Sequence, residues 1–205
     1  MNVSFLDNES IWRTADHFRL SKELTDHVMP PIDVLHIVDV IMHFDVIDIP
    51  DLMAVLRMDA AIVPGEKTIY VDRDAIQGWE RHDRWIEKRL RFSVAHELGH
   101  LLLHREYQEG LHFADFDQFK RWIMEHRNNR LEDQADEFAG RFLVPPGILQ
   151  EEYDHFQQKL AAADSSWHDI EGMRAHLAKN IATRFGVNYQ VIETRFAREG
   201  LWPLE

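Results

Sequence analysis

The sequence has no cysteine among its 205 residues. Without thiols the chain can form neither a disulfide framework nor a thiolate metal site. Long hydrophobic runs are also missing, because no stretch approaches the roughly 18 apolar residues that a membrane-spanning helix needs. The first residues lack the basic segment and following apolar segment of a secretory signal. From these absences we expect a soluble, cytoplasmic protein with no membrane partner.

Positive charge is scarce as well. The chain has 23 Lys and Arg residues against 36 Asp and Glu residues, which gives a formal net charge of −13 at pH 7. Binding to nucleic-acid phosphates depends on clustered lysine and arginine, so we do not expect direct nucleic-acid binding. The hydrophobic content of 45% is enough to bury a core in one or two domains.

Residues 92–103, FSVAHELGHLLL, hold two histidines four residues apart, with a glutamate directly after the first. At 3.6 residues per turn, His96 and His100 project from one face of a helix about 40° apart, so both imidazoles can contact one ion. Glu97 can then reach the open side of that ion. This HExxH pattern is typical of zinc peptidases, because zinc accepts neutral imidazole and carboxylate ligands and activates a water molecule at an open position.

The alternative is that these histidines are ordinary core residues, since the chain has 13 histidines in all. The residues around them are apolar on almost every side of the helix, which indicates a buried helix. Two imidazoles and a carboxylate in such surroundings need partners, and a metal ion would supply one. We therefore favour a metal site.

The segment 130–146 is predicted to be a second helix, closed by a pair of prolines. Its apolar residues follow the helical period: Leu131, Ala135, Phe138, Ala139 and Phe142. Glu132 and Asp136 are four residues apart and share one flank of this apolar face. Glu132 can serve as the third metal ligand, and Asp136 can accept the free ring N–H of a ligand histidine. The alternative is a solvated acidic face, which we predict for Asp133 and Glu137.

The motif HELGHLLLH preceded by RFSVA, with ExxADxFAGRFLVPP about 30 residues later, resembles the ImmA/IrrE family of bacterial and phage zinc metallopeptidases, part of the gluzincin group. The segment 60–72 also looks like the short hairpin that precedes the active-site helix in that family. The resemblance therefore covers roughly residues 30–200.

The resemblance implies that His96, His100 and Glu132 bind zinc and that Glu97 is the general base. Members of the family are typically paired with helix-turn-helix repressors, which they cleave or inactivate. A repressor of this kind is therefore the protein substrate that the resemblance implies.

Spacing excludes the metzincin class, which requires glycine three residues and histidine six residues after the second motif histidine. Leu103 and Glu106 occupy those positions. His104 lies one turn beyond His100 on the same stripe, about 6 Å further along the helix, and so cannot easily join the same ion. We interpret His104 as a surface residue or as a partner of a ligand histidine.

The chain as a whole predicts a predominantly helical α+β fold. Its parts would be a minimal zincin core with a small sheet and an active-site helix, and a C-terminal helical subdomain that resembles a helix-turn-helix. The predicted divisions are an N-terminal helical appendage at residues 1–30, the metallopeptidase core at 31–150 and the C-terminal subdomain at 151–205.

Local signals place several elements within these divisions. We expect an amphipathic helix or appendage at residues 5–28, a helix capped by Asp33, a short helix from Pro50 to Leu56 and a hairpin over residues 60–72.

Two further clusters have open interpretations. The basic residues before the HExxH motif form a solvated helix face or a docking patch for an acidic partner: Arg81, Arg84, Lys88, Arg89 and Arg91. The aromatic stripe at residues 111–124 is expected to pack into a core, with a lid over the cleft as the alternative.

Near the C-terminus, Ala182, Gly186 and Ile192 occupy the small residue, the turn glycine and the apolar position of a helix-turn-helix. DNA recognition does not follow, because basic and acidic side chains are nearly balanced over residues 178–205 and the second helix presents Glu193. We predict a structural or protein-binding subdomain here.

The leading functional hypothesis is a regulatory zinc endopeptidase, in which Glu97 deprotonates the attacking water and then protonates the leaving amine. Tyr107, His112, Tyr153 and Tyr189 are candidates for the group that stabilises the oxyanion, and the sequence does not choose among them. Two alternatives stay open: the toxin of a toxin–antitoxin pair, and a partner-binding regulator with a purely structural zinc. The presence of Glu97 argues against the regulator.

Overall fold

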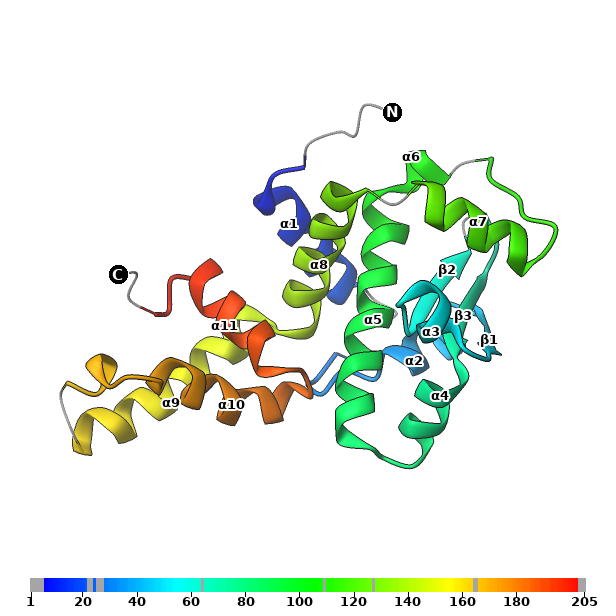
Figure 1. The fold of residues 1–205 in the computed structure, drawn as a ribbon. Coiled ribbons are helices and arrows are strands. Elements are labelled where there is room, and N and C mark those ends of the chain that lie inside the picture. Colours follow the sequence, from blue (N-terminus) through cyan, green and yellow to red (C-terminus); the bar gives the residue numbers. More distant parts are fainter. Residues whose placement is uncertain are drawn as a thin grey trace.

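The computed structural model describes residues 6–21, 24, 28–63, 65–108, 110–126, 128–163 and 166–202. Helices predominate around a small sheet, so the predicted α+β class is confirmed (Figure 1). The elements in chain order are α1 (Asn8–Arg19), α2 (Val34–His36), the π-helical η1 (Ile37–Ile41), β1 (Asp45–Ile49), α3 (Leu52–Leu56), β2 (Ala60–Val63), β3 (Thr68–Asp72), α4 (Arg73–Glu80), α5 (Arg84–Leu103), α6 (Arg105–Gln108), α7 (Phe116–His126), α8 (Asn129–Leu143), α9 (Pro146–Ala163), the 3₁₀-helical η2 (Trp167–Asp169), α10 (Met173–Phe185) and α11 (Tyr189–Arg198).

The sheet has three strands in the order β1-β3-β2. The predicted hairpin is confirmed, because β2 and β3 pair antiparallel, with Ala61 opposite Tyr70. β1 was not predicted. It pairs parallel with β3 at the other edge of the sheet, and its aspartate-containing sequence DVIDI stays largely exposed. A short, largely exposed edge strand in which aspartates interrupt the apolar residues gives a weak sequence signal.

The helices predicted before the hairpin are present in shorter form. α1 covers part of the segment 5–28, some of which lies outside the described residues. The carboxylate of Asp33 accepts a hydrogen bond from the backbone N–H of His36 at 3.0 Å, so Asp33 caps α2 as expected. α3 begins at Leu52, two residues after Pro50, and ends at Leu56 as predicted.

Helix α5 crosses the centre of the molecule, between the sheet and α8 (Figure 1). Asp83 caps its first turn by accepting hydrogen bonds from the backbone N–H groups of Trp85 and Ile86. β2, α4 and α8 all pack on α5, so apolar residues on several sides of this helix are covered. The buried ones include Leu90, Val94, Ala95 and Leu98. The nearly all-round apolar pattern of this helix reflects that central position.

Gly99 sets the distance between α5 and α8. A Cβ atom at this position would lie 3.0 Å from the Cα of Ala135 and 3.2 Å from the Cβ of Phe138, so a larger residue would force the helices apart. The glycine inside the HExxH motif thus allows the close crossing that brings the start of α8 over the two histidines.

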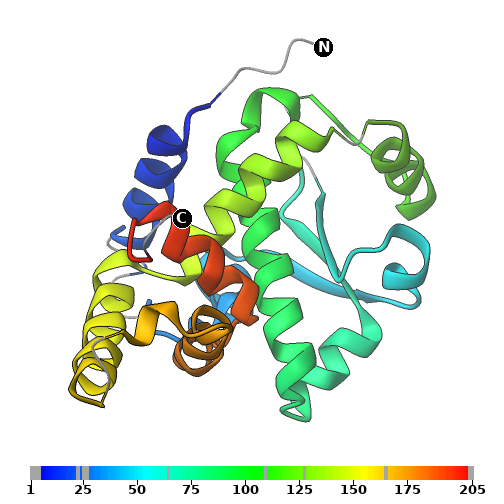
Figure 2. The same cartoon turned by 60° about the vertical axis from the view of Figure 1, so that its left-hand side comes forward.

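Helices α1 and α11 lie on the side of α8 that faces away from the sheet (Figure 2). Ile11 of α1 and Phe196 of α11 belong to the same hydrophobic cluster as Leu90 of α5. Buried side chains from all three predicted divisions therefore contribute to one core, while the division boundaries themselves stay a prediction.

The predicted helix–turn–helix pair is present as α10 and α11, which pack on each other. Gly186 ends α10 with φ +61°, a left-handed conformation that suits glycine. Its carbonyl accepts a hydrogen bond of 2.6 Å from a guanidinium nitrogen of Arg91, whose Nε donates to the carbonyl of Ile32. Arg91 is buried, so it belongs neither to a solvated face nor to a docking patch.

The aromatic stripe forms a second, smaller hydrophobic cluster on the sheet. Phe119 of α7 is buried with Ala61 and Val63 of β2, and the ring of Phe116 packs edge-on against Tyr70 at a centroid distance of 5.2 Å. This arrangement matches the core-packing interpretation. Within the described residues, none of the helices has the length and apolar character needed to cross a membrane.

Candidate metal centre

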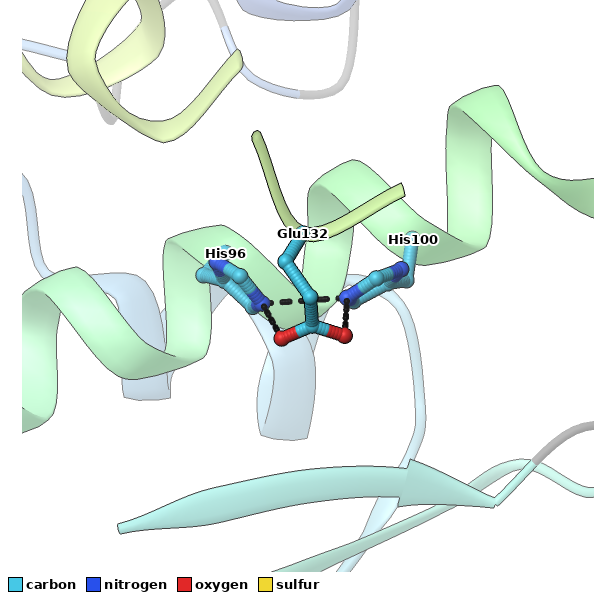
Figure 3. Close-up of side chains that lie close together, drawn as sticks. All are labelled: His96, His100 and Glu132. Carbon is cyan, nitrogen blue, oxygen red and sulfur yellow. Dashed lines mark hydrogen bonds and ion pairs between the residues drawn. The ribbon is translucent and has the colours of Figure 1, made fainter. Parts of the chain in front are cut away.

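Three side chains from α5 and α8 converge at the crossing of the two helices (Figure 3). The Nε2 atoms of His96 and His100 lie 3.0 Å apart. The Oε2 atom of Glu132 is 3.6 Å from Nε2 of His96, and its Oε1 atom is 3.6 Å from Nε2 of His100. One ligand atom from each residue lies within 4.8 Å of the other two, so this group could hold a metal ion.

Asp136 contacts the other ring nitrogen of His96. Its Oδ1 atom is 2.7 Å from Nδ1 of His96. Burial lowers the pKa of His96, but hydrogen bonds to Asp136 and Glu132 and the nearby charge of Glu97 outweigh this effect and raise the pKa to about 10. These surroundings favour positive charge at the imidazole, whether a proton or a metal cation carries it.

His100 has a different support. Its Nδ1 atom is 3.0 Å from Nδ1 of His104, and Nε2 of His104 is 2.9 Å from Oε1 of Gln134. His104 is buried at 3% exposure, so the interpretation as a surface residue is wrong and its contact is with a motif histidine. Burial lowers the pKa of His104. Gln134 was not identified from the sequence, because nothing in its spacing sets it apart from other polar residues of α8.

Glu97 lies between α5 and the sheet. It is buried at 5% exposure, and its Oε2 atom accepts a hydrogen bond of 2.8 Å from the backbone N–H of Ile62 in β2. β2 is an edge strand of the described sheet, and the N–H of Ile62 points away from β3 toward this carboxylate. The hairpin therefore holds Glu97 in place.

A cavity of about 240 Å³ opens beside this group. The described residues that line it are Arg57, Met58, Ala60, Phe92, Ser93, His96, Glu97, Glu132 and Asp136. Among them Arg57 alone carries a permanent positive charge. Arg57 caps the end of α3 with φ +60°, a left-handed conformation, and its position in the cavity was not predicted because α3 and α5 are distant in sequence.

Two further cavities lie toward α11. A second cavity of about 400 Å³ shares Phe92 and Asp136 with the first. A third, of about 390 Å³, shares Gln190, Thr194 and Arg198 with the second. Hollows that share lining residues thus lie along α8 and α11 between the candidate metal centre and the exposed side of α11.

Three of the four residues predicted as oxyanion donors are not among the described residues that line the first cavity: His112, Tyr153 and Tyr189. Tyr153 is buried against Phe196 at a ring-centroid distance of 5.6 Å, in the C-terminal helices. Tyr189 belongs to α11 beneath the Lys179 ammonium, and His112 is exposed. The side chain of Tyr107 lies outside the described part of the structure.

The two remaining acidic residues of the second motif differ from each other. Asp133 is exposed, as predicted for a solvated face. The prediction is wrong for Glu137, which is buried at 8% exposure. Its carboxylate accepts hydrogen bonds from Nε1 of Trp12 at 2.5 Å, a guanidinium nitrogen of Arg195 at 2.6 Å and Nε of Arg198 at 3.0 Å. Partners from both ends of the chain cover it, and its local spacing could not reveal them.

Comparison with family models agrees with the motifs. The model of the M78 peptidases, described as the IrrE N-terminal-like domain, matches residues 86–197. This match covers more than half of the chain, and the protein belongs to that family. The matched region begins in α5 and ends in α11, so it includes both histidines, α8 and the C-terminal helix pair. A search of curated proteins found no match.

Proposed function

We propose that the protein is a zinc-dependent endopeptidase, with zinc bound by His96, His100 and Glu132. The observation that carries this proposal is the convergence of two imidazole nitrogens, 3.0 Å apart, and a carboxylate whose two oxygens each lie 3.6 Å from one of them. Ligand atoms about 2.0–2.1 Å from a tetrahedral zinc ion lie about 3.3 Å from one another, so the donor set fits zinc in chemistry and its spacing is close to that of a zinc site. When bound, zinc would supply Lewis-acid polarisation of the scissile carbonyl and of a water molecule.

The other groups around the cavity have matching roles in peptide hydrolysis. Glu97 receives the proton of the attacking water and delivers it to the leaving amine. The amide N–H of Ile62 orients the carboxylate of Glu97 for this transfer. Asp136 orients His96 through Nδ1, which leaves Nε2 directed at the ligand group. Arg57 is the cation that we assign to the developing oxyanion, because it lines the same cavity as Glu97.

The substrate that we propose is a helix-turn-helix transcriptional repressor, so the peptidase would act in regulation. Membership in the family supports this proposal. The hollows that extend from the metal centre to α11 give room for more of a protein substrate than the residues next to the cut. Gln190 and Thr194 of α11 would contact that extended part.

Glu97→Gln separates hydrolysis from structure. The amide oxygen of glutamine can still accept the hydrogen bond of Ile62, so zinc content and thermal stability should stay nearly unchanged. Hydrolysis should fall by about 10² to 10⁴ because the general base is gone. Arg57→Met should likewise keep zinc and lower kcat more than it raises KM.

The measurement is cleavage of a helix-turn-helix repressor from the same organism, incubated with zinc-loaded protein and followed by mass spectrometry. We expect site-specific fragments with the wild type and almost none with Glu97→Gln. An intact repressor after incubation with the zinc-loaded wild type would rule out the proposed substrate. Equal cleavage by the Glu97→Gln variant would rule out the proposed mechanism.

A further inference from the structure

We propose that His104 and Gln134 set the tautomer of His100, so that Nε2 of His100 presents a lone pair to the metal. This inference rests on the proposed metal site. His104 is then a positioning residue that does not bind the ion. It links His100 to Gln134, and we call this chain of hydrogen bonds the relay.

The contacts form a relay from α8 to the metal group. Gln134 Oε1 lies 2.9 Å from Nε2 of His104, and Nδ1 of His104 lies 3.0 Å from Nδ1 of His100. His104 and Gln134 are 3% and 5% exposed, so bulk water does not compete for these positions. A hydrogen bond between two imidazole nitrogens requires one proton in the gap, so the tautomers of His100 and His104 are coupled.

The direction of the relay follows from the amide oxygen of Gln134. An oxygen can only accept, so Nε2 of His104 carries a proton and Nδ1 of neutral His104 is an acceptor. Nδ1 of His100 must then carry a proton and donate it. Neutral His100 is left with an unprotonated Nε2, which is the atom that faces His96 and Glu132.

The opposite orientation of the amide would reverse every step. An N–H group of Gln134 directed at His104 would put the proton of His100 on Nε2 and block metal binding. In the structure the amide nitrogen of Gln134 is buried without a hydrogen-bond partner among the described residues. This orientation therefore leaves one donor unsatisfied, and we infer that binding of a cation to His100 compensates for it.

The two ligand histidines are thus supported by groups of different charge. Asp136 accepts from His96 as a carboxylate, whereas the relay to His100 ends on a neutral amide. Glu97, Glu132 and Asp136 already surround His96. A neutral relay fixes the second imidazole without adding a fourth negative charge beside them.

Two nearly isosteric variants test the relay. The His104→Asn variant presents an amide oxygen close to the former place of Nδ1 and can accept from His100 without Gln134, whereas the leucine side chain of His104→Leu cannot accept. We expect His104→Leu to weaken zinc binding roughly 10- to 100-fold and His104→Asn to stay close to the wild type. Zinc affinity is measured by competition with a chromogenic chelator, after circular dichroism has shown that each variant is folded.

A double-mutant cycle distinguishes a relay from packing. Gln134→Met should weaken zinc binding in the wild type but have no further effect in the His104→Asn background, since the acceptor for His100 no longer depends on Gln134. Gln150→Met on α9 is the matched control, because its amide nitrogen bonds Asp154, away from the site. Equal losses for the His104→Asn and His104→Leu variants, or an equal effect of Gln134→Met in both backgrounds, would overturn the proposal.

The relay can also be observed directly in the metal-free protein. Long-range ¹H–¹⁵N NMR spectra should show the proton of His100 on Nδ1 and that of His104 on Nε2. The opposite tautomers would overturn the inference even if zinc binds. A wild-type protein that binds no zinc would instead overturn the proposed metal site, while the NMR spectra would still decide the direction of the relay.

Discussion

Asp136 and Glu137 are neighbours on α8, yet their surroundings are opposite. The side chain of Asp136 is 57% exposed and contacts His96, a proposed metal ligand, at the rim of the cavity. The side chain of Glu137 is 7% exposed and is enclosed by Trp12, Arg195 and Arg198. Successive residues on a helix point about 100° apart, so one α-helix can serve two unrelated tasks on two faces.

The buried face of α8 joins the two ends of the chain. Arg195 of α11 pairs with Glu137 and with Glu199, and Glu199 also pairs with Arg141 of α8. Arg141 pairs in turn with Asp16 of α1 at 2.6 Å. Loss of α11 would expose this network and so disturb the whole helix. Point substitutions on α8 therefore distinguish the contributions of its two faces better than truncation does.

The largest expected effect is on the metal-binding face. Glu132→Ala removes one of the three proposed ligands, and the two histidines alone should not hold zinc at stoichiometric occupancy at neutral pH. The metal-free protein should stay folded but lose some stability at neutral pH, because Glu132 is outside the ion network of Arg195 but helps to raise the pKa of His96. Metal analysis after dialysis, with thermal denaturation as the folding control, checks this. Full zinc occupancy would show that the ligand assignment is wrong.

On the opposite face, Glu137→Ala should lower the free energy of unfolding by about 3–5 kcal/mol, because it leaves Arg195 buried without this partner. Zinc affinity of the folded variant should be close to that of the wild type. Urea unfolding of the metal-free protein measures the loss. A change below about 1 kcal/mol would mean that the network adds little to stability.

Asp136→Ala should act on the metal as well as on stability. We expect zinc affinity to fall roughly 10- to 100-fold, since His96 loses the acceptor that orients its ring. The metal-free protein should also lose stability at neutral pH, because Asp136 helps to raise the pKa of His96 in the folded state. Asp133→Ala is the matched control, an exposed aspartate one turn earlier that contacts no described histidine. Equal zinc affinities for the two variants would show that Asp136 does not support the ligand.

Sequence periodicity identified which residues of α8 share a face, but it did not identify the elements that pack on each face. The four-residue spacing of Glu132 and Asp136 correctly put them beside the motif histidines, because α5 and α8 both use the helical period there. Glu137 was predicted incorrectly, since its partners lie 125, 58 and 61 residues away in the chain. Contacts over such separations leave no local signal.

The same limit applies to the rest of the fold and site. The hairpin and the α10–α11 turn carry local signals in Gly65 and Gly186, both of which have positive φ. No local sequence signal marks β1 or the buried contact of His104 with Gln134. β1 depends on its pairing with β3, and the His104 contact depends on the packing of α8. Spacing therefore predicted that the proposed ligands lie close together, but it did not predict that Gln134 contacts His104 behind them.

The smallest expected effect concerns Asp59, a buried carboxylate with fewer partners than Glu137. One oxygen accepts from Nε of Arg89 at 2.7 Å, and the other has no hydrogen-bond partner among the described residues. Burial raises the pKa of Asp59 above its usual 3.8, against the opposing effect of Arg89. The folded state therefore binds the proton more tightly than the unfolded state. Its contribution to stability is full below about pH 3.8 and is lost as pH rises through the folded-state pKa.

Asp59→Asn removes this titration while keeping the shape of the side chain. The stability of the wild type relative to the variant should therefore decrease as pH rises from about 4 toward 7, as measured by urea unfolding of both metal-free proteins at each pH. The difference between the two proteins isolates Asp59 from the other carboxylates that titrate in this range. A difference that stays constant, or that grows in favour of the wild type as pH rises, would mean that the hydrogen bond from Arg89 outweighs burial. Asp59 would then resemble Glu137 in being a buried carboxylate held mainly by arginine partners.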